Sequence, residues 1–361
     1  MERIPNKIYS GKWGKCHCQG ACMDTFNQYV YYSFTTKLVK TDLEGNVIST
    51  VDNIIGHLGC IQFNDEDKKV YASLEYKNDE IGKGILRSLG ISDDNADDGF
   101  YVAVFDVDKM DRIGMDAEKD GIMTAVYLKT VVDCYKGSAV AGGKEYQHIH
   151  GCSGIDGITI GPDFGAKGAD ADKKYLYVCY GVYNQVDRPD NDYQVLLQYD
   201  LDGFLDDAKP LSQRVMHKNG PKEPRNKYFL YTGNTSYGIQ NLEYDAYTGD
   251  FFVFVYRGSK PQFPNYDTFV IDGKVPAVTQ KLKGYDDYEG KVLFTKDIGD
   301  KVGEVSGLYF PLGSMGTYSL KNGQFMLVDP IWDEPEDLSV NLVKYDLIVT
   351  DGKYKFEKVE K

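Results

Sequence analysis

Residues 155–162 (IDGITIGP) and 238–245 (GIQNLEYD) share the pattern that decides the fold. In both segments a small residue opens a short apolar strand, and the strand ends at Asp, Asn or Pro. Residues 19–24 (QGACMD), 57–64 (HLGCIQFN) and 304–311 (EVSGLYFP) carry the same pattern, which makes five copies. Internal repetition of this kind indicates one supersecondary unit used several times over.

Each copy is followed by strands rich in aromatic residues and then by an acidic turn. Residues 69–76 (KVYASLEY) illustrate the aromatic strand, and residues 198–203 (QYDLDG) and 269–273 (FVIDG) illustrate the turn. Asp-Gly supplies the positive φ angles that tight hairpins need, so each unit is expected to fold as four antiparallel strands, a propeller blade. The sequence therefore predicts an all-β fold. We expect a single five-bladed β-propeller over residues 1–361, with inner strands starting near residues 19, 57, 155, 238 and 304.

The copies are unevenly spaced, so long insertions must separate strands in some blades. The candidate insertions are residues 77–99, 203–227 and 258–288, which are rich in Gly, Pro, Asp and Lys. Loops of this length in compact domains often act as lids or local decoration. The first dozen residues are expected to supply a closing strand to the last blade.

The five copies resemble the five-bladed β-propeller proteins as a structural class, over nearly the whole chain. This class includes glycosidases of the arabinanase type, calcium-dependent nucleotidases and sugar-binding lectins. The catalytic strings of these families do not align with this chain residue by residue. The resemblance therefore implies a fold and assigns no function to any residue.

Charge and composition exclude several partners. The formal net charge is −14 and the isoelectric point about 4.9, so the protein should repel nucleic acid and anionic membrane surfaces. No apolar run approaches the roughly 20 residues that span a bilayer. The seven cysteines are an odd number and several lie in expected strands, which favours reduced thiols in the cytoplasm. A secreted protein whose leader had been removed would look the same.

Polar residues precede or begin every repeat, and the inner strands of a propeller converge on one axis. Three of the five histidines stand at these positions. The expected ring of ligand-binding and catalytic residues consists of His17, Gln19, His57, His150, Ser153, Asp156, Gln240, Asn241, Glu304 and Ser306.

This ring admits two chemical interpretations. His57, His150 and Glu304 could bind a divalent cation (calcium, magnesium or zinc) that activates water, although their spacing matches no zinc-binding string. Alternatively, Asp156 and Glu304 could act as a metal-free acid and base, as in glycoside cleavage, which needs two carboxyl groups about 5 to 10 Å apart. The alternative for Asp156 is a structural cap at a turn.

Three functions follow from these interpretations. The first is a hydrolase or lyase that acts on a small polar or carbohydrate-like substrate. The second is a non-catalytic propeller that binds a ligand or another protein, and the third treats the ring as a hydrogen-bonded plug that holds the blades together. Trp13 and Trp332 are candidates for stacking on a ligand, with packing as the alternative. The chain contains no GxGxxG, Walker, GxSxG or HExxH motif in the required context, which disfavours the usual nucleotide-dependent enzymes and serine hydrolases.

Overall fold

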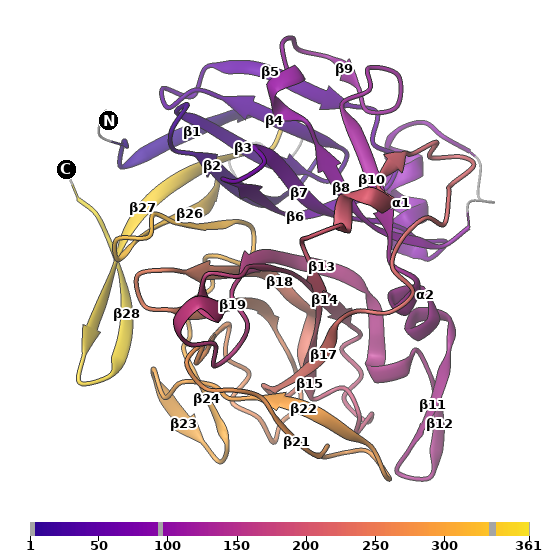
Figure 1. The fold of residues 1–361 in the computed structure, drawn as a ribbon, viewed down its shortest axis with the longest axis vertical. Helices are drawn as coiled ribbons and strands as arrows, with labels where there is room; N and C mark the ends of the chain where they lie inside the picture. Colours follow the sequence, from indigo (N-terminus) through magenta and orange to yellow (C-terminus); the bar gives the residue numbers. More distant parts are fainter. Residues whose placement is uncertain (1–3, 93–96, 332–336, 361) are drawn as a thin grey trace.

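The structure is a computed structural model that describes residues 4–92, 97–331 and 337–360. The chain folds as a five-bladed β-propeller (Figure 1). The first blade contains β2(Cys18–Asp24), β3(Tyr29–Phe34), β4(Lys37–Thr41) and β5(Val47–Asp52). The second contains β6(His57–Asn64), β7(Lys69–Tyr76), β8(Gly99–Phe105) and β10(Met123–Tyr127). The third contains β13(Cys152–Gly161), β14(Tyr175–Val182), β15(Tyr193–Asp200) and β17(Asn226–Tyr231).

The fourth blade is less regular than the first three. It contains β18(Thr235–Asp245), β19(Asp250–Arg257) and β20(Thr268–Ile271). The outer edge of β20 makes two isolated bridges, from Thr268 to Leu308 and from Ile271 to Thr295, where a fourth strand would run.

The fifth blade joins the two ends of the chain. It contains β25(Thr317–Ser319), β26(Gln324–Ile331) and β27(Ser339–Thr350), and β1(Lys7–Lys12) pairs antiparallel with β27. Figure 1 shows the two termini beside this blade, where β28(Lys353–Lys358) extends the same sheet. The expected closing strand at the N-terminus is therefore present, and it closes the ring without a covalent link.

The inner strands contact one another around the axis in the order β2, β6, β13, β18 and β25, and β25 returns to β2. Four of these strands cover the expected repeats, but the fifth does not. Residues 304–311 instead lie at the edge of the fourth blade, where β23(Asp300–Val302) and β24(Val305–Gly307) form a hairpin. Val305 and Gly307 are buried there, which explains why this segment imitates an inner strand. The real inner strand, β25, has only three residues and gives too short a pattern to detect.

Aromatic side chains fill the space between adjacent blades. Tyr31 of the first blade stacks on Phe63 of the second with ring centroids 5.9 Å apart, and Phe252 of the fourth packs on Phe325 of the fifth at 4.8 Å. Twisted sheets leave wedge-shaped gaps that large rings fill well. All seven cysteines are unpaired thiols.

The three predicted insertions contain α1(Glu80–Ser88), β16(Lys209–Pro210) and β21(Val278–Lys281), whereas β9(Met115–Asp116), α2(Lys129–Lys136), β11(Ser138–Ala141) and β12(Lys144–Gln147) lie between residues 115 and 147, where no insertion was predicted. Residues 77–99 include the helix α1, whose N-cap Asp79 accepts a hydrogen bond from the Gly82 amide at 2.9 Å. The first three blades are widened by short strands: β9, β16, β21 and β22(Glu289–Leu293). The chain also forms the helix α2 and a hairpin of β11 and β12. In the described ranges, none of the helices has the length and apolar character needed to cross a bilayer.

Candidate functional site

A cavity of about 460 Å³ lies where the inner strands converge. It collects residues from the first four blades, and six of them belong to the expected ring: His17, Gln19, His57, Ser153, Asp156 and Gln240. The remaining wall includes Ile81 of α1, so the helical insertion borders the cavity. The structure thus brings together most of the predicted ring in one place.

Irregular backbone positions these side chains. The four longer inner strands each carry a break in register near the cavity, and such bulges bend a strand and redirect its side chains. In β18, Tyr237 has a φ of 62°, and Gly238 follows with a φ of 78°. A Cβ at Gly238 would lie 2.4 Å from the Tyr180 carbonyl oxygen, so only glycine fits. Tyr237, which is 47% exposed, lines the cavity from this strained turn, and such strain is concentrated at functional sites.

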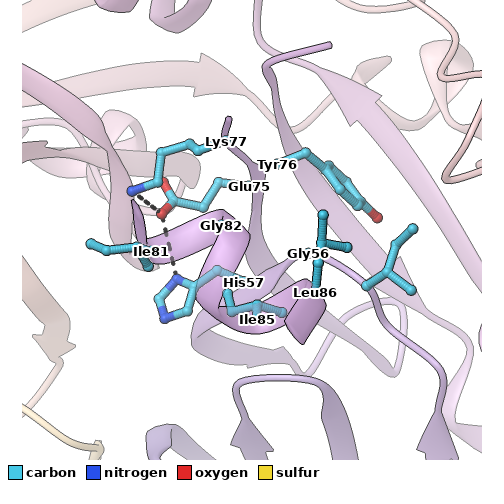
Figure 2. A pocket seen from close by; sticks show the side chains of 10 residues that line it. Gly56, His57, Glu75, Tyr76, Lys77, Ile81, Gly82, Ile85 and Leu86 are labelled. Carbon is cyan, nitrogen blue, oxygen red and sulfur yellow. Dashed lines mark ion pairs between the residues drawn. The ribbon is translucent and has the colours of Figure 1, made fainter. Parts of the chain in front are cut away.

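A charged cluster borders the cavity, centred on Glu75 near the end of β7. Figure 2 shows Glu75 between Lys77 and His57. The Glu75 Oε1 atom lies 2.6 Å from the Lys77 Nζ atom and 3.6 Å from the His57 Nδ1 atom. Its Oε2 atom accepts a hydrogen bond from the Ile155 amide at 3.1 Å. Lys77 also donates to the Ser153 carbonyl at 3.0 Å, so the pair joins the second blade to the third.

Asp156 is the second carboxyl group of the cavity. Its Oδ1 atom lies 3.8 Å from the same His57 Nδ1 atom, and its Oδ2 atom accepts a hydrogen bond from the Gln240 side chain at 3.1 Å. The facing oxygens of Glu75 and Asp156 are therefore no farther apart than the sum of their two distances from His57. Both carboxyl groups therefore approach the same imidazole nitrogen, Glu75 from the second blade and Asp156 from the third.

Burial shifts the pKa values of the titratable groups in this cluster. It raises the pKa of Asp156 well above its usual range, and the charge of Glu75 adds to the shift. Burial, reinforced by Lys77, lowers the pKa of His57 to about 3, so its imidazole is neutral. For Glu75, burial raises the pKa while Lys77 opposes the shift. Burial also disfavours the Lys77 ammonium, but the attraction of Glu75 and Asp79 outweighs it and raises the pKa of Lys77.

The expected metal ligands are not brought together. His57 borders the axial cavity, whereas His150 is buried among aromatic rings and its Nδ1 atom lies 2.7 Å from the Tyr285 hydroxyl. Glu304 is exposed at the edge of the fourth blade and pairs with Lys283. Among the described residues no three His, Cys, Asp or Glu side chains form a cation site. In the axial cluster the Lys77 ammonium supplies the positive charge beside Glu75.

The pairing of Asp156 with Glu304 as acid and base is also wrong, because Glu304 lies outside the cavity for the reason given above. Ser306 is buried in β24 and donates a hydrogen bond to Asp297 at 3.2 Å. Asn241 is 1% exposed and donates to the carbonyl oxygens of Gln19 and Ser314. Asn241 thus ties several inner strands together, as the plug interpretation expects for this residue.

Four polar residues of the cavity were not predicted: Glu75, Lys77, Tyr237 and Tyr256. A signal for the first pair exists, since Glu75 interrupts an apolar and aromatic strand and a lysine follows two residues later. Ionised side chains in such a strand are rarely buried unless paired. Nothing in the sequence marks Tyr237 and Tyr256 among the 29 tyrosines.

Comparisons with known proteins find similar folds only. No protein-family model matches the chain, and no curated protein matches it either. The chain is similar to a GH43 β-1,3-galactosidase solved with galactodeoxynojirimycin (12% identity, 96% of this chain and 95% of that one, TM-score 0.44). It is also similar to the arabinanase Arb43A of Bacillus subtilis (10%, 96% and 100%, 0.39) and to the PQQ domain of pyranose dehydrogenase from Coprinopsis cinerea (9%, 90% and 81%, 0.39).

Proposed function

We propose that the protein is a hydrolase that cleaves a carbohydrate-like substrate in the axial cavity, with Asp156 as the general acid. The observation that carries this proposal is the environment of Asp156, whose pKa burial raises and whose Oδ2 atom is oriented by Gln240. A carboxyl group that keeps its proton at neutral pH can donate it to a leaving oxygen. Burial favours the protonated form of Asp156, and its side chain lines a cavity large enough for a small ligand.

The charge balance of the cavity favours a neutral substrate. Burial favours the neutral forms of Asp156 and His57, and the Lys77 ammonium faces Glu75. The remaining polar groups are the His17 imidazole, amides and hydroxyls, and amides and hydroxyls suit the hydroxyl groups of a sugar. Tyr237 and Tyr256 add partly exposed rings, and aromatic faces pack well on sugar rings.

Glu75 takes the role of the second carboxyl group. In the proposed reaction Asp156 gives its proton to the glycosidic oxygen as the bond from carbon to that oxygen breaks. Water attacks the same carbon, and its proton passes to Glu75, which Lys77 and the Ile155 amide hold toward the ionised form. The sum of these steps is hydrolysis, with both carboxyl groups restored by exchange with solvent.

The test is a search for cleavage products. The purified protein is incubated with a library of neutral oligosaccharides, and products are detected by mass spectrometry. We expect Asp156→Asn to lower turnover at least 100-fold, the lower end of a general acid's contribution. Glu304→Gln is the matched control, because it makes the same carboxyl-to-amide change outside the cavity and should leave turnover unchanged. Equal turnover by wild type and Asp156→Asn would contradict the assignment.

A non-catalytic binding propeller is the second candidate, and one observation favours it. Both oxygens of Glu75 are already engaged, by Lys77 and by the Ile155 amide, so this carboxylate is occupied before water arrives. In that case the wild type binds oligosaccharides without cleaving them, and Asp156→Asn weakens binding. Melting-temperature shifts with the same library separate this candidate from the enzyme.

A further inference from the structure

A second cavity opens beside the axial one. It has a volume of about 860 Å³ and lies between the first blade and α1. The two cavities share His17, Gln19, His57 and Ile81 along their borders. The two cavities therefore adjoin each other, with Asp156 in the axial part and Trp13 in the outer part.

The combined size exceeds what one small ligand needs. Pockets for drug-sized ligands have volumes of roughly 300 to 1,000 Å³, and each of the two cavities falls within this range by itself. A ligand that occupied only the axial part would leave the larger part to water. The dimensions thus match a chain of several linked units.

The lining of the outer cavity is polar and close to balanced in charge. Lys37 and Asp52 form an ion pair at 3.5 Å, with both side chains partly exposed. Lys15 adds a second lysine to the lining. Two hydroxyl side chains also line the cavity, Thr35 from the first blade and Ser88 from α1. Hydroxyl groups and paired charges offer donors and acceptors to the hydroxyls of a sugar.

Trp13 supplies a fixed aromatic surface in this lining. Its indole Nε1 donates a hydrogen bond to the Ser10 carbonyl at 2.8 Å, and its ring packs on Phe34 with centroids 5.9 Å apart. The Lys37 Nζ atom lies 5.2 Å from the ring centroid. The ring is held from several sides and still lines the cavity, so it is preorganised for stacking, which lowers the entropy cost of binding. Trp332, the other tryptophan considered, lies outside the described residues.

We propose that the outer cavity binds further sugar units of an oligosaccharide whose scissile bond lies at Asp156, with Trp13 as the stacking platform. This inference rests on the proposed function, because the axial site defines where the bond is cut. It deepens that function by naming the substrate as an oligomer of at least three units. The outer cavity confers the preference for length.

The first test compares substrates of increasing length. For Trp13→Ala we expect KM to rise about 3- to 10-fold on trisaccharides and longer chains, the range of one aromatic contact, with disaccharides unaffected. Phe26→Ala is the matched control, because Phe26 is 79% exposed at the turn between β2 and β3. Phe26→Ala should change KM neither on the longer chains nor on disaccharides. Equal weakening on all lengths, or none on any, would overturn the proposal.

A second variant leaves Trp13 in place. Ser88 lies at the end of α1 and lines the outer cavity, so Ser88→Trp should narrow the cavity and reduce the preference for long chains. Calorimetric binding of the same oligosaccharides separates the two proposals. Length-dependent binding without cleavage would retain the outer site and reject the hydrolase, whereas cleavage without length dependence would do the reverse.

Discussion

Replacing Lys77 by methionine tests how strongly the axial charge cluster holds the fold together. The Lys77 and Glu75 side chains are only 5% and 4% exposed. Lys77→Met would leave Glu75 buried with one hydrogen-bond donor, the Ile155 amide. Breaking a buried pair on one side costs about 3 to 5 kcal/mol. At about 2.1 cal/mol/K per residue, the 361 residues give an unfolding entropy near 0.8 kcal/mol/K, so Tm should fall by roughly 5 °C.

The assay is thermal unfolding of three proteins at pH 7. Glu75→Gln combined with Lys77→Met removes both charges and keeps an acceptor for the Ile155 amide, so it should recover most of the lost stability. The deficit of Lys77→Met should also shrink below pH 4.5, the ordinary pKa of Glu75, because the carboxyl is then neutral in the folded and unfolded chain alike. A double variant as unstable as Lys77→Met would refute this reasoning.

Three further perturbations test other parts of the structure. Burial raises the pKa of Glu243 from 4.5 to about 8, so its ionisation costs stability as pH rises from 4.5 to 8. Glu243→Gln should gain roughly 3 to 5 kcal/mol relative to wild type between pH 4 and pH 9 in urea titrations, and an unchanged difference would contradict the assignment. Deleting residues 1–12 removes β1 and the buried Ile8 from β27 and should lower the free energy of unfolding by roughly 5 kcal/mol in the same titration. A truncated protein as stable as the full-length protein would show that the closing strand is dispensable. EDTA should leave Tm unchanged, because Lys77 occupies the place of a cation beside Glu75, and a stability loss together with released metal would disprove this.

The sequence predicts the architecture better than the site. The repeated pattern of a small residue, a short apolar strand and a final Asp, Asn or Pro identifies four inner strands, because each of these strands has seven or more residues in which the pattern can develop. The fifth inner strand has three residues and cannot show a period. Residues 304–311 fit the repeat pattern better than this strand does, because they form a buried edge of the fourth blade whose composition resembles that of an inner strand.

The same error removes one member of the predicted acid and base pair. Asp156 follows from its place in a correctly identified strand, whereas Glu304 follows from a misplaced one. Glu75 was not predicted because it lies on the second strand of its blade and not on an inner strand. The contact between β7 and β13 in the folded protein brings Glu75 close to the axis. The outer cavity depends on α1, an insertion whose position over the blade has no sequence signature.

A crystal structure of the Asp156→Asn variant with the oligosaccharide that most raises its melting temperature would test most directly whether the axial cavity binds the substrate. We expect sugar density that begins in the axial cavity, with a glycosidic oxygen within hydrogen-bond distance of the side chain at position 156, and continues toward Trp13. Density confined to another face of the propeller, with both cavities free of sugar, would contradict this expectation.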